Sequence, residues 1–312
     1  LAARFFLERI LNIRVRAEYP MMFKDLQTIY YPNNTIFIGI SQGGQSQSTC
    51  KALQKAREHG AFTIGISENC NANIFNYSDI QILMECGPEL SVAKTKGYIA
   101  MMGILFILGI EGAKTKKLLE SAEYEDILSR LHKTANNFDK IIETSTDWVN
   151  SIKDELTKCN RLILLGYKNN YANVLEGALK MLETMRYGIY GYEIEEFFHG
   201  IYNSINKDTY IMYLGSDGEY KEKVRTLKTV LDEITSHQFI ITKQIDDYEP
   251  TPKDCIIPFV DDPDFSVFEY IIPIQIIASI IPYELGINPF FASDPLFHSK
   301  VGSKLANVVQ IQ

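Results

Sequence analysis

One loop in the first half of the chain gathers groups that bind anions. It contains Ser41, Gln42, Gly43, Gly44 and Ser46, after a short apolar run and before a helical pattern. Hydroxyl groups, glycine N–H groups and a helix N-terminus at one point are typical of a phosphate site. Serine and glycine also cap and turn helices without binding a ligand, so this alternative stays open. Because the GxxxxGK[ST] and GxGxxG patterns are absent, one small phosphate fits better than ATP or a dinucleotide.

A second candidate group lies on a helix of the second half. Glu176, Lys180 and Glu183 are spaced i, i+4 and i+7, so they share one helix face, and a dense segment ending in His199 and Gly200 follows. Carboxylate, ammonium and imidazole groups in one cleft suffice for proton transfers on a sugar. A solvated stripe on the protein surface is the alternative interpretation of the same spacing.

The anion-binding loop requires a strand before it and a helix after it. Residues 35–40 form a β-branched apolar run, residues 52–56 carry apolar positions at helical spacing, and Gly60 is placed to end that helix. Two more apolar runs, 61–66 and 80–84, predict further strands. A strand, a polar glycine loop, a helix and a strand make a βαβ unit, which requires a parallel sheet.

The second half follows the same order of elements. Strands are predicted at 161–165, 210–214 and 238–242, with a helix at 171–185 whose core positions are Leu175, Leu179 and Leu182. Each half also contains an uncharged apolar run, 97–110 and 270–283, of 14 residues. A membrane-spanning helix needs about 20 residues, so both runs are predicted to be helices buried in a soluble core. The fold class expected is α/β, with two domains that each hold a parallel sheet flanked by helices on both faces.

Composition excludes several classes of protein. The 312 residues are 46% hydrophobic and 22% charged, which is not typical of disordered or fibrous chains. With 31 basic against 39 acidic residues the formal charge is −8, so neither nucleic acid nor an anionic membrane is an expected partner. The five cysteines show no CxxC pair and no zinc spacing. We expect reduced thiols, a cytoplasmic location, no metal and no cofactor.

Several ordered motifs resemble the double SIS (sugar isomerase) family, in particular the isomerase half of glucosamine-6-phosphate synthase. They are GISQGG at 39–44, ELSVAKTK at 89–96, LEGALK at 175–180, EFFHG at 196–200, and a lysine in the C-terminal tail. Gly43 departs from this pattern, because serine is common there. The resemblance covers nearly the whole chain and implies two SIS-type domains.

The resemblance also implies a role for each matching residue. Ser41, Gln42 and Ser46 would hold the sugar phosphate, with Val92 and Ala93 on the neighbouring wall. Glu183 would move a proton between C1 and C2, with Lys180 and Glu176 as its neighbours, while His199 would open the sugar ring. Lys300 is the first choice for the tail lysine and Lys304 the alternative.

The expected domains are 1–130, a helical connector at 131–154, and 155–312 with the tail. Since the chain starts at Leu1, the first strand of the family fold is expected to precede it, and no glutaminase domain is recognised. The function implied is an enzyme acting on a hexose or amino-sugar 6-phosphate by isomerisation, deamination or fructosamine-6-phosphate deglycation. A homodimer with shared active sites is expected. The alternative is a sugar-phosphate-sensing regulatory protein without catalysis.

Overall fold

A computed structural model describes residues 1–24, 29, 31–87, 89–215, 220–244 and 248–305. The chain divides into two compact units. The three-stranded unit comprises Arg14–Leu90, Lys94–Leu108 and Phe291–Gln312. The five-stranded unit comprises Leu1–Ile13, Ser91–Ala93 and Gly109–Phe290.

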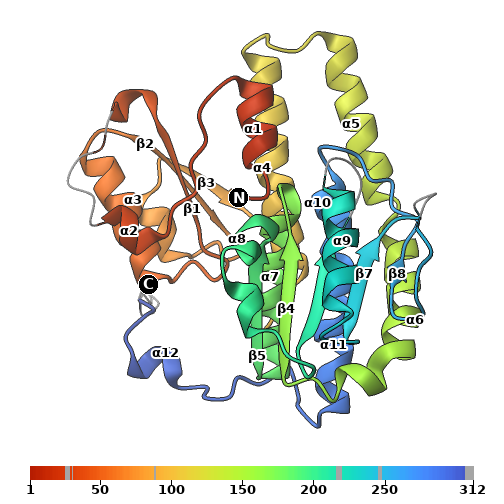
Figure 1. The fold of residues 1–312 in the computed structure, drawn as a ribbon. Helices are drawn as coiled ribbons and strands as arrows, with labels where there is room; N and C mark the ends of the chain where they lie inside the picture. The colour runs from red at the N-terminus through yellow and green to blue at the C-terminus, as the bar shows by residue number, and fades with distance from the viewer. Residues whose placement is uncertain (25–28, 30, 88, 216–219, 245–247, 306–312) are drawn as a thin grey trace. The chain divides into compact units, whose positions relative to one another are not determined.

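The sheet of the three-stranded unit is parallel, in the order β1-β2-β3 (Figure 1). Its strands are β1 (Ile36–Ile40), β2 (Phe62–Ser67) and β3 (Ile80–Leu83). Helix α3 (Gln47–Glu58) connects β1 to β2, and helix α4 (Lys96–Thr115) begins in this unit. The shorter helical segments are α2 (Pro20–Lys24), α12 (Phe297–Lys300) and the 3-10 turns η1 (Pro32–Asn34) and η2 (Asn73–Tyr77).

Helices cover both faces of this sheet. On one face α3 packs with η2 around Cys50, Leu53 and Ile74. Close packing here requires a glycine in β1, because a Cβ on Gly39 would lie 2.7 Å from the Leu53 side chain. On the other face Ile64 and Ile66 of β2 meet the first turns of α4. The chain leaves α3 through Gly60, whose φ of +83° lies in the left-handed region that favours glycine.

The five-stranded unit has a parallel sheet in the order β5-β4-β6-β7-β8 (Figure 1). Its strands are β4 (Arg161–Gly166), β5 (Gly188–Glu193), β6 (Tyr210–Leu214), β7 (Gln238–Thr242) and β8 (Cys255–Ile256). Its helices are α1 (Arg4–Leu11), α5 (Ser121–Ala135), α6 (Phe138–Leu156), α7 (Asn169–Met185), α8 (Ile194–Phe198), α9 (Lys221–Leu231), α10 (Ser266–Tyr270) and α11 (Ile272–Glu284), with the 3-10 turn η3 (Ile201–Ser204).

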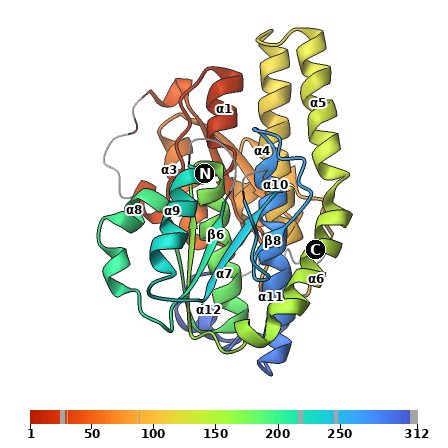
Figure 2. The ribbon, with the colours of Figure 1, turned by 45° about the vertical axis from the view of Figure 1, so that its right-hand side comes forward.

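Helices cover both faces of the five-stranded sheet as well. Side chains of α8 and α9 form one buried cluster with alternate residues of β4, β6 and β7. On the other face α11 packs against α6 and α7 (Figure 2). The predicted strands, their parallel pairing and the α/β class with two helix-flanked sheets are therefore confirmed.

Helix α7 buries a different face from the one predicted. Leu179 and Leu182 are exposed, whereas Val174, Ala178 and Met181 are buried. Small residues explain the difference, since a Cβ on Gly177 would lie 2.7 Å from the Ile274 side chain of α11. The two helix backbones approach too closely there to leave room for leucine, so the predicted leucine core of α7 was wrong.

The two apolar runs also differ from each other. Both become helices whose length and composition would allow a membrane span, namely α4 and the segment Ser266–Glu284. In the latter, 72% of the most apolar 18-residue window is buried, as predicted for a core helix, whereas in α4 the corresponding share is only 33%. Ile107 in the middle of α4 is 40% exposed. The prediction that both runs are buried core helices was therefore confirmed for the second run and wrong for the first.

Candidate functional site

The anion-binding loop extends from the carboxyl end of β1. The Ser41 N–H still pairs with β2, donating to the Ile66 carbonyl at 3.1 Å, and the Ser41 carbonyl accepts from Gly44 N–H at 2.9 Å. Neither Gln42 nor Gly43 uses its backbone N–H toward any described residue. The chain thus turns sharply after β1 and leaves two adjacent N–H groups available to an anion.

The two glycines of the loop have different roles. Gly44 adopts φ +70°, and a Cβ there would lie 2.1 Å from the Cβ of Ala72. A Cβ on Gly43 would meet no atom within 4 Å. Gly44 is therefore required by the turn, whereas Gly43 leaves open space that a side chain such as serine can fill.

Two further hydroxyl groups lie beside Ser46 at the start of α3. The Ser46 Oγ is 3.2 Å from Ser48 Oγ and accepts from Thr49 Oγ1 at 3.0 Å, while Ser46 N–H reaches Ser41 Oγ at 3.5 Å. Ser46 precedes α3 without capping it through its own side chain. The Ser46 hydroxyl is therefore not used to cap α3.

The side chain of Gln42 is held by two carboxylates. Its Nε2 donates to Glu68 at 2.8 Å and to Glu89 at 3.2 Å. Since both amide hydrogens face carboxylates, this side chain offers a ligand only its carbonyl oxygen. The backbone N–H of Gln42 is the group that can bind a phosphate in this arrangement.

The Glu89 carboxylate caps the N-terminus of α4. Its carboxylate accepts hydrogen bonds from the N–H groups of Thr95 at 2.7 Å, Lys96 at 3.0 Å and Gly97 at 3.0 Å, and from Thr95 Oγ1 at 3.0 Å. Burial alone would raise the pKa of Glu89, but these hydrogen bonds outweigh it and lower the pKa below its usual value. A carboxylate seven residues before the first residue of a helix was the available signal, and the sequence interpretation gave Glu89 no role.

The tail pairs directly with the loop. Ser46 and Lys304 form an antiparallel bridge, with Gln47 N–H donating to Ser303 at 3.3 Å and Leu305 N–H donating to Gln45 at 2.9 Å. Leu305 also packs against the buried cluster under α3. Lys304 is thereby fixed beside the loop.

Lys300 makes a different contact. It lies in α12, is solvent-exposed, and forms an ion pair with Asp294 at 2.6 Å. Of the two tail lysines, Lys304 is therefore the one whose backbone is paired with the anion-binding loop.

Val92 and Ala93 belong to the five-stranded unit. Val92 N–H donates to the Pro289 carbonyl at 3.2 Å, and the Ser91 hydroxyl donates to the same oxygen at 3.2 Å. Ala93 is buried. This short segment is thus tied to the chain just after α11.

The charged stripe on α7 is not a solvated surface. Lys180 is only 6% exposed, and its Nζ lies 2.8 Å from Glu183 and 3.6 Å from Glu176. Burial raises the pKa of Glu176, the Lys180 ammonium opposes that rise, and the Glu183 carboxylate adds to it. One buried ammonium therefore lies between two carboxylates with different surroundings. Such an arrangement is typical of sites that transfer protons.

His199 lies at the end of α8. The Glu193 carboxylate caps the N-terminus of this helix, accepting hydrogen bonds from the N–H groups of Glu195 at 2.7 Å and Glu196 at 3.2 Å. The imidazole is exposed, and among the described residues it makes no hydrogen bond or ion pair with the α7 stripe. The structure thus brings Glu176, Lys180 and Glu183 together and leaves His199 apart from them within this unit.

The described side chains contain no cluster of three histidine, cysteine or acidic residues with the geometry of a metal site. All five cysteines are described, and none forms a disulfide.

Comparisons with known proteins agree on one family. A family model described as the SIS domain matches residues 2–108 and 155–260. The glutamine–fructose-6-phosphate aminotransferase (isomerizing) of Aquifex aeolicus is 27% identical over 289 residues, which is 91% of this chain and 47% of that protein. The chain thus spans about half the length of this relative.

Two solved structures are more similar still. A candidate phosphosugar isomerase from Clostridium difficile is 34% identical with a TM-score of 0.92, covering 98% of this chain and 86% of its own. A candidate sugar-binding protein from Salmonella typhimurium is 32% identical with a TM-score of 0.80, covering 90% and 84%. Two SIS matches, one over each parallel sheet, together with these relatives, show that the chain belongs to the SIS-domain family.

Proposed function

We propose that this protein is an enzyme acting on a hexose or amino-sugar 6-phosphate, by isomerisation, deamination or fructosamine-6-phosphate deglycation. The observation that carries the proposal is the Lys180 ammonium, buried between Glu176 and Glu183. Burying an ammonium group and partly burying two carboxylates opposes folding unless their interactions compensate. A protein that only recognises a sugar phosphate has no need of this arrangement, whereas an enzyme that enolises a sugar needs a positioned carboxylate.

The phosphate has a matching set of donors in the loop after β1. We assign it to the hydroxyls of Ser41 and Ser46 and to the free N–H groups of Gln42 and Gly43, with Val92 and Ala93 as neighbouring wall residues by resemblance. Anions at the N-terminus of a helix also gain from its dipole. Serine at position 43, common in the family, would add a hydroxyl in the open space there.

The chemical step is assigned to the residues that the family resemblance names. Glu183 is the base that moves a proton between C1 and C2, Lys180 and Glu176 are its neighbours, and His199 assists ring opening. We place Lys304 rather than Lys300 as the tail lysine, because the pairing of Lys304 with Ser46 fixes it beside the loop.

Proton exchange tests the proposal. Incubation with fructose 6-phosphate in deuterated water should introduce deuterium at C1 or C2, detected by NMR. Glu183→Gln keeps the shape of the side chain and removes its basicity, so exchange should slow by about 10²–10⁴-fold. Glu143→Gln, on the exposed face of α6, is the matched control and should leave the rate unchanged. Full exchange by Glu183→Gln would contradict its role as the base.

The reaction type requires a substrate panel. Purified protein should be assayed against hexosamine 6-phosphates and fructosamine 6-phosphates, because isomerisation, deamination and deglycation share enolisation or imine chemistry. Lys304→Gln and Lys300→Gln form a matched pair of tail variants. We expect only Lys304→Gln to lower turnover, and the reverse result would return the role to Lys300.

We also propose a cytoplasmic homodimer in which His199 serves the site of the partner subunit. Mixing inactive Glu183→Gln with inactive His199→Ala subunits should restore part of the activity. A demonstrably mixed dimer without recovery would contradict shared sites.

A sensor without catalysis is the second candidate function. It is favoured by the 32% identity to a protein described as a candidate sugar-binding protein. Tight binding of fructose 6-phosphate with no deuterium exchange would support this alternative over the enzyme.

A further inference from the structure

The carboxyl end of β6 repeats the hydrogen bonding of the carboxyl end of β1. Beyond β1, Ser41 N–H donates to the Ile66 carbonyl of β2 at 3.1 Å. Beyond β6, Gly215 N–H donates to the Ile241 carbonyl of β7 at 3.2 Å. Gly215 therefore occupies the position in the five-stranded sheet that Ser41 occupies in the three-stranded one.

The neighbouring strands extend the correspondence to Ser67 and Thr242. The Ser67 carbonyl accepts from Met84 N–H at 2.8 Å, and the Thr242 carbonyl accepts from Ile257 N–H at 2.9 Å. Both side chains are buried hydroxyls at the ends of central strands. Their polar partners differ, however.

Ser67 is satisfied within the protein and Thr242 is not. The Ser67 Oγ donates to the Gln42 carbonyl at 2.8 Å. Thr242 is 1% exposed, and its Oγ1 has no hydrogen-bond partner among the described residues. A buried hydroxyl without a partner lowers stability, so such a group calls for an explanation.

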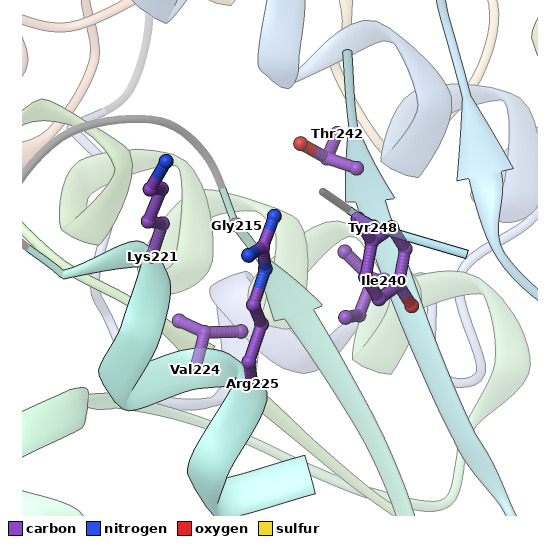
Figure 3. Close-up of a pocket in the computed structure, with 7 residues that line it drawn as sticks. All are labelled: Gly215, Lys221, Val224, Arg225, Ile240, Thr242 and Tyr248. Carbon is purple, nitrogen blue, oxygen red and sulfur yellow. The ribbon is translucent and has the colours of Figure 1, made fainter. Parts of the chain in front are cut away.

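Thr242 lines a pocket that also contains a second unpartnered donor. The pocket, which we call the β6 pocket, is a narrow cleft open to solvent and is lined by Gly215, Lys221, Val224, Arg225, Ile240, Thr242 and Tyr248 (Figure 3). The Nη2 of Arg225 is buried without a partner among the described residues, although Nη1 reaches Glu222 at 3.2 Å. The Arg225 guanidinium lies over the Tyr248 ring, 5.6 Å from its centroid.

The charged side chains that line the β6 pocket are cationic, while the acidic Glu222, which pairs with Arg225, lies outside the lining. Two of its lining residues, Lys221 and Arg225, carry positive charge, and none of its lining residues is acidic. In Figure 3 the Thr242 hydroxyl points toward the side of the pocket where the Lys221 ammonium and the Arg225 guanidinium lie. Lys221 is also the first residue of α9, whose N-terminus has no side-chain cap. Its first-turn N–H groups add to the attraction for an anion.

We propose that the β6 pocket is a second anion site, which binds the phosphoryl group of a small molecule. Arg225 Nη2 and Thr242 Oγ1 each donate a hydrogen bond to it, and Lys221 supplies a further charge. Donors that approach from three side chains can surround a tetrahedral oxyanion, and the fork of the Arg225 guanidinium matches phosphate geometry. The proposal depends on the donors of this pocket and not on the function assigned to the loop after β1.

Counting bound phosphate tests the proposal. Equilibrium dialysis with radiolabelled inorganic phosphate should show two binding sites per chain, one of which Ser41→Ala weakens. Thr242→Val and Arg225→Gln should each weaken the other site by about one order of magnitude or more, since each removes a hydrogen bond to an anion. Lys228→Gln removes a positive charge of α9 that pairs with Asp232 outside the pocket, so it should keep both sites.

The outcomes separate this site from the loop. Binding that Thr242→Val weakens and Ser41→Ala does not supports the β6 pocket even if the loop binds nothing. Phosphate binding that is unchanged in both Thr242→Val and Arg225→Gln overturns the proposal.

Thermal unfolding gives a second measurement that does not depend on stoichiometry. Because valine has the shape of threonine without an unsatisfied hydroxyl, Thr242→Val should melt at the same or a higher temperature in phosphate-free buffer. Its rise in melting temperature on adding phosphate should be smaller than that of the wild type. A lower melting temperature without phosphate, combined with an unchanged rise, would assign the hydroxyl a structural role and overturn the proposal.

Discussion

Strands β1-β2-β3 of one sheet and β6-β7-β8 of the other follow the same parallel order, yet they are buried to different degrees. β1 and β6 hold equivalent places, each before a loop and a helix, but β6 is buried along its whole length while β1 has exposed residues. The reason is the position of each strand. β6 pairs on both sides, with β4 and β7, whereas β1 is the edge of the sheet in the described part of the chain. Equal apolar runs therefore do not ensure equal burial.

The polar groups differ between the units in a complementary way. The three-stranded unit places hydroxyls, free N–H groups and a glycine turn at the end of its first strand. The five-stranded unit places a buried ammonium between two partly buried carboxylates on α7, which we call the ion triad, and a pocket lined by Lys221 and Arg225 at the end of β6. The same βαβ arrangement thus presents different polar groups in the two units, because the fold determines where side chains lie and the sequence determines which groups they bring.

The ion triad should contribute the largest stability effect. Lys180→Met preserves approximate volume but leaves Glu176 and Glu183 without their cation, which should destabilise the five-stranded unit by about 3–5 kcal/mol. The control is Lys153→Met, since Lys153 pairs with Glu284 on the surface and should contribute less than about 1 kcal/mol. Chemical denaturation measures both. Equal small effects would show that the triad is a surface feature.

The next largest difference in stability is expected between substitutions at equivalent positions of β1 and β6. Ile38 of β1 is 39% exposed and corresponds to Met212 of β6, which is fully buried. Met212→Ala should cost about 2–5 kcal/mol, because it leaves a cavity. Ile38→Ala should cost less than about 1 kcal/mol. Similar losses in denaturant unfolding would show that the outer face of β1 is covered in solution.

A smaller difference in stability is expected between substitutions at Gly43 and Gly44 of the anion-binding loop. Gly44→Ala places a Cβ in a left-handed conformation and against Ala72, so it should cost about 2 kcal/mol and abolish phosphate binding at the loop. Gly43→Ser meets open space and should leave stability unchanged while retaining or improving phosphosugar affinity. Calorimetric titration with fructose 6-phosphate measures both. Loss of binding in Gly43→Ser would contradict the open space at this position.

The strands were predictable because each is a continuous apolar run of a parallel sheet. The predicted runs 210–214 and 238–242 coincide with β6 and β7. The buried face of α7 was not predictable from its leucines, because Gly177 and Ala178 allow close helix packing that only the partner helix reveals. Helical spacing identifies a face, but it does not say which face meets a neighbour.

The candidate site shows the same limit. The loop motif identified Ser41, Gln42 and Ser46 as neighbours because they are close in sequence. The place of Lys304 depends on a bridge to Ser46, 258 residues away, which no local pattern reveals. The unpartnered Thr242 hydroxyl also required the structure, since threonine is an ordinary residue at the end of a strand.

The smallest predicted effect compares one carboxylate from each unit. Hydrogen bonds lower the pKa of Glu89 against the opposing effect of burial, whereas burial raises the pKa of Glu176 against Lys180. The stabilisation linked to Glu89 is present above its ordinary pKa of 4.5 and is lost as the pH falls through the lowered value. The stabilisation linked to Glu176 is present below pH 4.5 and is lost as the pH rises through the raised pKa of this carboxyl.

Replacing each residue with glutamine should therefore change the pH dependence of stability in opposite directions. Between pH 7 and pH 3, the advantage of the wild type over Glu89→Gln should shrink, because protonation of Glu89 also removes the charged cap of α4. Over the same range the wild type should gain stability relative to Glu176→Gln, because protonation neutralises a partly buried carboxylate.

Each change in the free energy of unfolding should be about 1 kcal/mol or less, since both groups are partly solvated. Denaturant unfolding at several pH values, with Glu143→Gln as the exposed control, measures these differences. Changes of the same sign for both variants would mean that the two units do not hold their carboxylates in opposite environments.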